Sequence, residues 1–209
     1  MPLPQTKVRG IAMRMLFWLP VLLVLAWLCH HQYAHLWLPV YRTVLEMTLS
    51  DFSVLSLDTG WANEPVFKVR LIADRLMVVQ GRALPAGFIV NAATPTSHAL
   101  VHPVVLAVVA LVWPGMGWRG RIARLMASLP CLLLLETIDI PLVLASSIND
   151  LLSYGINPAA DQASLLIDWV QVMDGGGRFA LSLAAAFLAA EIHHIRKLKR
   201  PSTNSERMT

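Results

Sequence analysis

The feature that most constrains this chain is the apolar run between residues 122 and 148. A helix rises about 1.5 Å per residue and needs about 20 predominantly apolar residues to cross the hydrocarbon core of a bilayer. This run is long enough alone, whereas the apolar segments at residues 16–29, 101–112 and 179–190 are long enough only with their flanks, which gives spans at residues 15–38, 98–115 and 177–195. The sequence therefore predicts an α-helical integral membrane protein with four transmembrane helices.

Composition and charge support this class and orient the helices. Only 14% of the 209 residues are charged and the mean hydropathy is +0.58, whereas a soluble domain averages about 25% charged residues. The basic residues gather in three clusters, namely Lys7, Arg9 and Arg14, then Arg119, Arg121 and Arg124, then Arg196, Lys197, Lys199 and Arg200. The positive-inside rule places residues 1–14, 116–121 and 196–209 in the cytoplasm. We therefore expect a bacterial-type inner-membrane protein with both termini cytoplasmic, whose net charge of +4 reflects orientation and contact with membrane lipids rather than nucleic-acid binding.

Residues 39–97 form a β-rich external insertion between the first and second predicted spans. A short interfacial helix is expected over residues 41–52, after which the pattern changes. Segments rich in β-branched and apolar residues, punctuated by Gly and Pro, predict strands at residues 52–60, 66–74, 75–81 and 86–95. Apolar residues alternate with Lys68 and Arg70, which is typical of an antiparallel strand with one solvated face. The insertion is expected to be a small β-meander that leans on the helices, the bilayer or a partner.

The second external region is predicted at residues 149–176. Five apolar residues in it fall on one face of a helix: Leu165, Leu166, Trp169, Val170 and Met173. This spacing predicts an amphipathic helix at the outer interface. Gly175–Gly177 are expected to form a flexible turn into the fourth span. The pattern of a phosphate-binding loop does not follow these glycines, so no nucleotide partner is predicted.

Two acidic residues, Glu136 and Asp139, interrupt the third span. They are three residues apart and share a helix face, and an ionised carboxylate at that depth costs about 2.5–3.5 kcal/mol. Pro130 and Pro141 bracket them and are expected to distort the helix. The acids are either a proton or cation site, or an acid–base pair, or structural groups of which at least one carries a proton. Arg178, near the outer end of the fourth span, is a candidate partner for Asp139.

Histidines supply the weaker candidates. His98 and His102 are four residues apart, a spacing that can hold a metal on a helix. No glutamate completes a metalloprotease motif, and Pro103 follows His102 directly, which disfavours a regular helix before it. We therefore expect boundary residues rather than a metal site, and no cofactor. No nucleophile motif is present, so catalytic residues are not assigned.

The fourth span carries small residues at every fourth position, at Ser182, Ala186 and Ala190. Such a face lets two helix backbones approach closely, either within the bundle or against another protein. The chain has no internal repeat of the kind that secondary transporters usually show. This combination favours a subunit that binds another membrane protein over a self-contained transporter.

The order of elements resembles that of the small membrane proteins that accompany bacterial exosortases. The likeness lies in an N-terminal anchor with FWLP (17–20), an external β-rich stretch leading through GFIVN (87–91) into the second span, and two further spans. It departs in the acidic third span and in DGGGR (174–178). The resemblance implies a non-catalytic accessory or assembly subunit in envelope protein sorting. The alternatives are a proton- or ion-coupled protein using Glu136 and Asp139, or an intramembrane enzyme.

Overall fold

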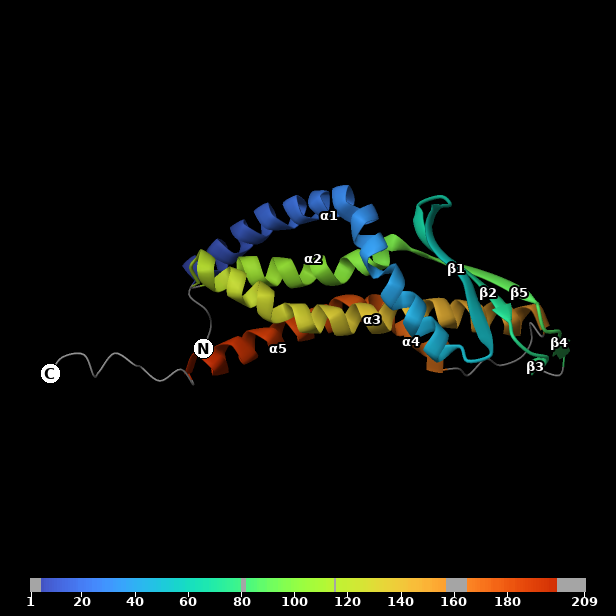
Figure 1. The fold of residues 1–209 in the computed structure, drawn as a ribbon. Coiled ribbons are helices and arrows are strands. Elements are labelled where there is room, and N and C mark those ends of the chain that lie inside the picture. The colour runs from blue at the N-terminus through green and yellow to red at the C-terminus, as the bar shows by residue number, and fades with distance from the viewer. Residues whose placement is uncertain (1–4, 80–81, 115, 157–164, 199–209) are drawn as a thin grey trace.

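The computed structural model describes residues 5–79, 82–114, 116–156 and 165–198. The chain is mostly helical, with a small antiparallel sheet between its first two helices (Figure 1). The helices are α1 (Gln5–Thr48), α2 (Thr96–Val112), α3 (Trp118–Ile156), α4 (Leu165–Val172) and α5 (Arg178–Leu198). The strands are β1 (Phe52–Trp61), β2 (Pro65–Ala73), β3 (Met77–Val79), β4 (Arg82–Leu84) and β5 (Ile89–Pro95). Lys199, Arg200 and residues 157–164 of the predicted second external region lie outside the described residues.

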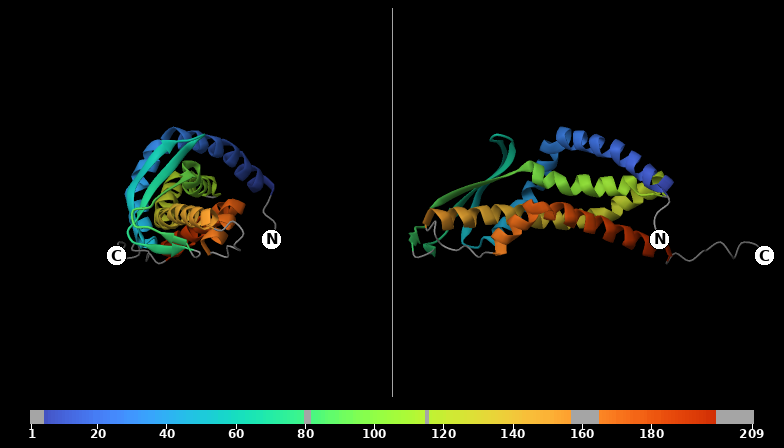
Figure 2. Two further views of the ribbon diagram at one scale, coloured as in Figure 1. Left: turned by 90° about the vertical axis from the view of Figure 1, so that its right-hand side faces the viewer. Right: turned by 180° about the vertical axis from the view of Figure 1, so that it is seen from behind.

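Three helical stretches are long and apolar enough to cross a membrane. They are Val8–Thr48 in α1, Trp118–Leu152 in α3, and Leu165–Glu191, which runs from α4 into α5. The second predicted span corresponds to α2, an apolar helix that falls below that length. The start of α1, the connection between α2 and α3, and the end of α5 lie together at one end of the bundle, while the sheet lies at the other (Figures 1 and 2).

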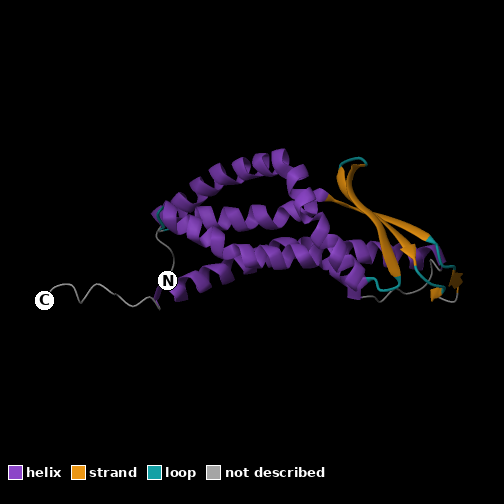
Figure 3. Ribbon diagram, in the orientation of Figure 1, coloured by secondary structure: helices purple, strands orange, loops and turns teal. Residues whose placement is uncertain are grey.

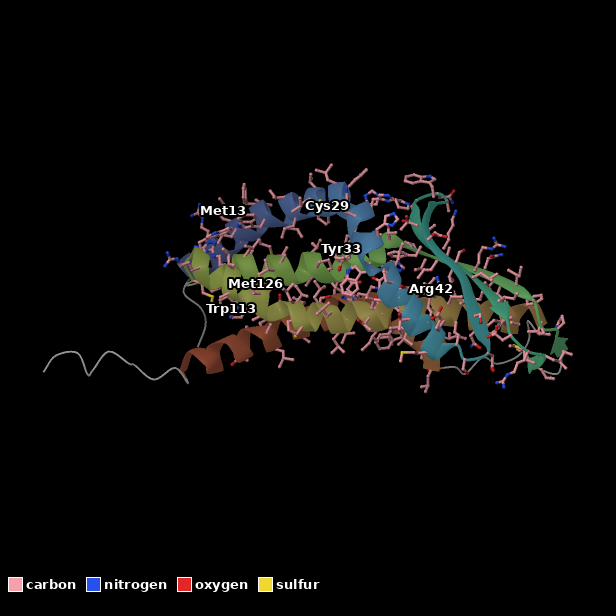
Figure 4. The ribbon with its side chains drawn as sticks, viewed as in Figure 1. Met13, Cys29, Tyr33, Arg42, Trp113 and Met126 are labelled. Carbon is pink, nitrogen blue, oxygen red and sulfur yellow. The ribbon has the colours of Figure 1, made fainter. Side chains whose placement is uncertain are left out.

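Helix α1 differs from the prediction at its C-terminal end. The prediction of a separate interfacial helix over residues 41–52 is wrong, because α1 continues unbroken to Thr48. The helix instead changes direction between the labelled residues Cys29 and Arg42 (Figure 4). Pro39 lies inside it; proline lacks the N–H that would bond one turn back and clashes with that turn, which is a recognised cause of a kink. The bend leaves an N-terminal half that arches over α2 and a C-terminal half that packs on the sheet.

The sheet follows most of the predicted strands but not the expected meander. Its strand order is β1-β2-β5, all antiparallel, and β3 and β4 form a separate hairpin inserted between β2 and β5 (Figure 3). The alternation expected from the sequence is present, since Lys68 and Arg70 are exposed and the apolar residues between and beside them are buried. Across the strands, Phe67 lies opposite Thr59 and Thr94.

One core joins the sheet to the helices. Tyr41 and Leu45 of α1, Phe67 and Leu71 of β2, and Ile140 of α3 are all completely buried in it. The rings of Tyr41 and Phe67 meet edge to face with their centroids 5.3 Å apart. This is a favoured geometry for an aromatic pair. The sheet therefore rests on the bent half of α1 and on α3, and needs no core of its own.

Helix α3 is longer than predicted, and α4 is joined to α5 without a loop. Helix α3 runs to Ile156, beyond its predicted end at residue 148. The predicted amphipathic helix is present as α4, but the glycines after it form a π-helical turn, Met173–Gly177, that leads directly into α5. The expected turn at the glycines is present as a kink between two helices, where Gly176 has φ of 106°, and its flexibility stays a prediction. The chain passes through a kink rather than a loop.

Candidate functional site

The first half of the site surrounds Glu136, which α3 directs toward α1. The Tyr33 hydroxyl donates to Glu136 Oε1 at 2.8 Å, and the Tyr41 hydroxyl donates to Oε2 at 2.6 Å. Tyr33, Trp37 and Tyr41 recur every four residues and therefore share one face of α1. The ring centroids of Tyr33 and Trp37 are 6.1 Å apart, and those of Trp37 and Tyr41 are 6.0 Å apart. Glu136 is completely buried, yet each of its carboxylate oxygens has a donor.

The second half surrounds Asp139, one turn further along α3. Arg178 Nε donates to Asp139 Oδ2 at 2.7 Å, and His102 Nε2 lies 3.2 Å from the same oxygen. The other ring nitrogen of His102 lies 2.8 Å from Ser182 Oγ. Arg178 also donates through Nη1 to Asp174 Oδ1 at 2.6 Å. These contacts connect α2, α3, the π-helical turn and α5.

Most of the cluster lies in the interior of the molecule, and Asp174 is exposed at its edge. Relative exposure is 0% for Glu136, His102 and Ser182, 2% for Asp139 and 4% for Arg178. Buried charges of this kind persist only when they are paired and hydrogen-bonded. Within the described part of the chain, two atoms of the ion pair have no hydrogen-bond partner, namely Asp139 Oδ1 and Arg178 Nη2.

The π-helical turn places Arg178 for this contact. Gly176 has φ of 106°, so the segment joins two helices across a kink, and Arg178 is the first residue after it. A Cβ atom at Gly177 would lie 2.6 Å from the carbonyl oxygen of Val172, so this turn closes only around a glycine. At Gly175, by contrast, a Cβ would meet nothing within 4 Å. The segment DGGGR (174–178) therefore positions Asp174 and Arg178 for their contacts in the cluster.

The structure brings some predicted residues together and separates others. Asp139 and Arg178, named as candidate partners from the sequence, are in direct contact. His98 and His102 do not act as a pair, because His98 Nδ1 lies 3.3 Å from Thr94 Oγ1 while His102 belongs to the buried cluster. The expectation that Pro103 would disfavour a helix before it is wrong, since α2 begins at Thr96 and passes through it. No group of three or more metal-binding side chains occurs among the described residues.

Sequence reasoning missed Tyr33, Tyr41, and the contact of His102 with Asp139. The available signal was that Tyr33 and Tyr41 are eight residues apart and so share one helix face, where a buried hydroxyl needs a partner. The structure also shows where the small-residue face of α5 packs. Ser182, Ala186 and Ala190 are all buried inside the chain, so this face is used for packing within the bundle.

Ser182, His102 and Asp139 form a row that invites comparison with a nucleophile, a base and an acid. The serine hydroxyl, however, lies 2.7 Å from the carbonyl oxygen of Arg178. Because a carbonyl oxygen only accepts, the hydroxyl donates to it and is the acceptor of the bond to His102. A nucleophilic serine would instead donate to its base. In this conformation the row is a hydrogen-bond chain with no exposed serine oxygen.

Comparisons of the chain with protein-family models, with curated proteins and with solved structures find no match in any of the three. The architectural resemblance to exosortase companions thus gains no support from relatives. The fold and the buried cluster are the features that bear on function.

Proposed function

We propose that this chain is a four-helix protein of a bacterial-type inner membrane and acts there as a non-catalytic accessory or assembly subunit. The single observation that carries the proposal is the buried cluster. Its buried ionisable side chains bond to one another across α1, α2, α3 and α5 and are closed to substrate, and only Asp174 at its edge is exposed. Their role in the proposal is to hold four helices in register under an external sheet.

The basic residues support the membrane orientation, whereas the length of α2 falls slightly short of a full crossing. Helix α2 has 17 residues. At about 1.5 Å per residue its length is about 26 Å. The hydrocarbon core that it would cross is about 30 Å thick. Arg121 and Arg124 lie near the start of α3, at the end of the bundle away from the sheet. The α2–α3 connection is therefore cytoplasmic in the proposal, and the sheet is external.

The surface left for interaction is a groove of about 780 Å³ between the solvated face of the sheet and the outer part of α3. Charged and amide side chains of both elements line it, namely Asp58, Lys68, Arg70, Asn91 and Asp150. Side chains of both signs on a solvated sheet suit a polar segment of another envelope protein. An accessory role in exosortase-type sorting is one such task, proposed from the resemblance in architecture alone.

Co-purification from native membranes tests this proposal. Arg70→Glu reverses a charge inside the groove, whereas Arg75→Glu reverses one outside it on an exposed side chain. We expect a partner protein to co-purify with the wild type and with Arg75→Glu but to be lost with Arg70→Glu at equal membrane levels. Equal recovery from all three, or no partner from wild-type membranes, contradicts the proposal.

A second candidate is a proton- or ion-coupled function centred on Glu136 and Asp139. The observation that favours it is the pair of buried atoms without a partner among the described residues, Asp139 Oδ1 and Arg178 Nη2. Such atoms often mark a functional site. Glu136→Gln removes the titratable proton and keeps the shape. Loss of complementation in a deletion strain, with unchanged membrane levels, would favour coupling over the accessory role.

A further inference from the structure

A second cavity, of about 700 Å³, lies between the arched half of α1 and α2. It lies outside the buried cluster and outside the groove of the sheet. Its volume is within the roughly 300–1,000 Å³ that ligand sites occupy, and its walls are mostly apolar, as such sites are. The two walls are helix faces, and the turn between β1 and β2 closes one end.

The lining changes character along the cavity. The two helices run in opposite directions, so His30 of α1 lies at the same end as Thr96 of α2. That end, next to the sheet, also carries Asn63, Glu64 and Ser97. The opposite end is lined only by apolar side chains, namely Leu19, Leu23, Val101, Val104 and Val105. The cavity is therefore polar at the outer face of the proposed membrane and apolar at depth.

Its length matches half a bilayer. The lining runs from Leu19 to His30 on α1 and from Thr96 to Val105 on α2. At about 1.5 Å per residue these stretches are about 16 Å and about 14 Å long. The hydrocarbon core of a bilayer is about 30 Å thick, so one leaflet accounts for about 15 Å. A cavity that ends at the leaflet midplane and opens at the interface has the dimensions of a lipid chain.

The polar end selects the headgroup. His30 Nδ1 lies 2.6 Å from the carbonyl oxygen of Trp27. That oxygen only accepts, so Nδ1 donates and Nε2 of the neutral ring accepts. Glu64 adds a carboxylate, so two acceptors are available for an ammonium group. Ser97 and Asn63 line the same end and can donate to a phosphate, which the N-terminus of α2 also favours. A carboxylate at the mouth disfavours a purely anionic headgroup.

We propose that the cavity binds one phospholipid of the outer leaflet that carries an amine headgroup, with an acyl chain lying between α1 and α2. The inference rests on the membrane orientation given under the proposed function. It gives the bent form of α1 a function, because the bend between Cys29 and Arg42 sets the arched half apart from α2.

Photo-crosslinking tests the site. The full chain is reconstituted in vesicles of phosphatidylethanolamine and phosphatidylglycerol containing a trace of phosphatidylethanolamine with a photoactivatable acyl chain, and labelled residues are mapped by mass spectrometry. We expect labels on the facing sides of α1 and α2, reduced several-fold by Leu100→Trp and by Val104→Phe, which fill the cavity. Leu133→Trp, on an exposed face of α3 away from the cavity, should leave the labelling unchanged.

Headgroup choice is measured by competition in the same vesicles. Unlabelled phosphatidylethanolamine should displace the probe several-fold better than phosphatidylglycerol, and Glu64→Gln should remove that preference. Labels spread evenly over all exposed helix faces, with no effect of either cavity variant, would show annular lipid and overturn the proposal. Equal competition by the two lipids would overturn the headgroup assignment.

The orientation is checked separately, so that the two failures are distinguishable. Ala62→Cys, at an exposed position of the turn between β1 and β2 that does not line the cavity, is treated in intact cells with a membrane-impermeant maleimide, in a background with Cys29 and Cys131 replaced by serine. Reaction without any cavity crosslink overturns the lipid site and leaves the proposed function standing. Absence of reaction with a folded protein overturns both. A crosslink from the cavity to a polypeptide in native membranes would show a protein helix in place of the lipid and overturn the lipid site.

Discussion

Glu136 and Asp139 lie one helical turn apart, but their surroundings give them different roles. Glu136 accepts from two neutral phenols, whereas Asp139 faces the Arg178 guanidinium and the His102 ring. A buried ion pair is costly to break, because removal of one partner leaves the other charge unpaired in a low dielectric. A buried carboxyl bonded to hydroxyl groups is closer to an ordinary hydrogen-bonded group.

We therefore expect the two amide variants to differ. Asp139→Asn should lower the free energy of unfolding by up to about 3 kcal/mol, since Arg178 loses its buried counter-charge and keeps only the half-exposed Asp174. Glu136→Gln should cost only about 1 kcal/mol, because the amide still offers an oxygen to one tyrosine and a donor to the other. Thermal unfolding of the purified protein in detergent measures both. The double variant Asp139→Asn, Arg178→Gln should recover part of the loss, and equal melting temperatures for the two single variants would contradict this account.

At the scale of elements, the sequence predicted what depends on local pattern. Hydrophobic length located all four apolar helices, and alternation located the main strands. A helix was expected over residues 41–52, but its continuity with the first span was missed, because Tyr41 and Leu45 of this half pack against the distant sheet. The half of the site around Glu136 was likewise not predicted from the sequence. Tyr33 and Tyr41 meet Glu136 across 103 and 95 residues, and no local pattern reports such a contact.

The π-helical turn allows a matched glycine pair to be compared. Gly177→Ala should move the backbone, because its Cβ would lie 2.6 Å from the Val172 carbonyl oxygen. The strain of such overpacking costs about 1–3 kcal/mol. Gly175→Ala has open space and should be neutral or slightly stabilising. The melting temperatures in detergent report both. If the turn acts by placing Arg178, the losses from Gly177→Ala and Asp139→Asn should be less than additive.

The small-residue face of α5 gives a second matched pair. Ala186 is buried between helices, whereas Ala184 on the same helix is exposed. Ala186→Leu should force the backbones apart and lower stability by about 1–3 kcal/mol, while Ala184→Leu should change little. Unfolding in mild detergent compares them. A stable Ala186→Leu protein that instead loses a bound partner would assign this face to a second protein and contradict the packing seen here.

At the scale of the whole molecule, the arrangement depends on α2, the shortest of the helices that the four spans require. Among the described residues, the chain between the sheet and α3 contains no other helix, so α2 alone decides whether the two ends of the bundle lie on opposite sides of a membrane. The buried cluster supplies a reason for α2 to remain in the bundle, since His102 is bonded to both α3 and α5. A short helix held by interior polar contacts can cross where its length alone would be marginal.

Cysteine accessibility then decides the topology. Asn63 lies in the turn between β1 and β2, and Gly117 lies in the connection from α2 to α3, and both are exposed. In the background lacking Cys29 and Cys131, Asn63→Cys should react with an impermeant maleimide in intact cells, whereas Gly117→Cys should react only after permeabilisation. The basic residues that follow Gly117 give the physical reason, because Lys and Arg near a span are retained on the cytoplasmic side. Reaction of both cysteines in intact cells would place the sheet and the basic connection on one side. In that case α2 does not cross, and a four-helix bundle with an external sheet is excluded.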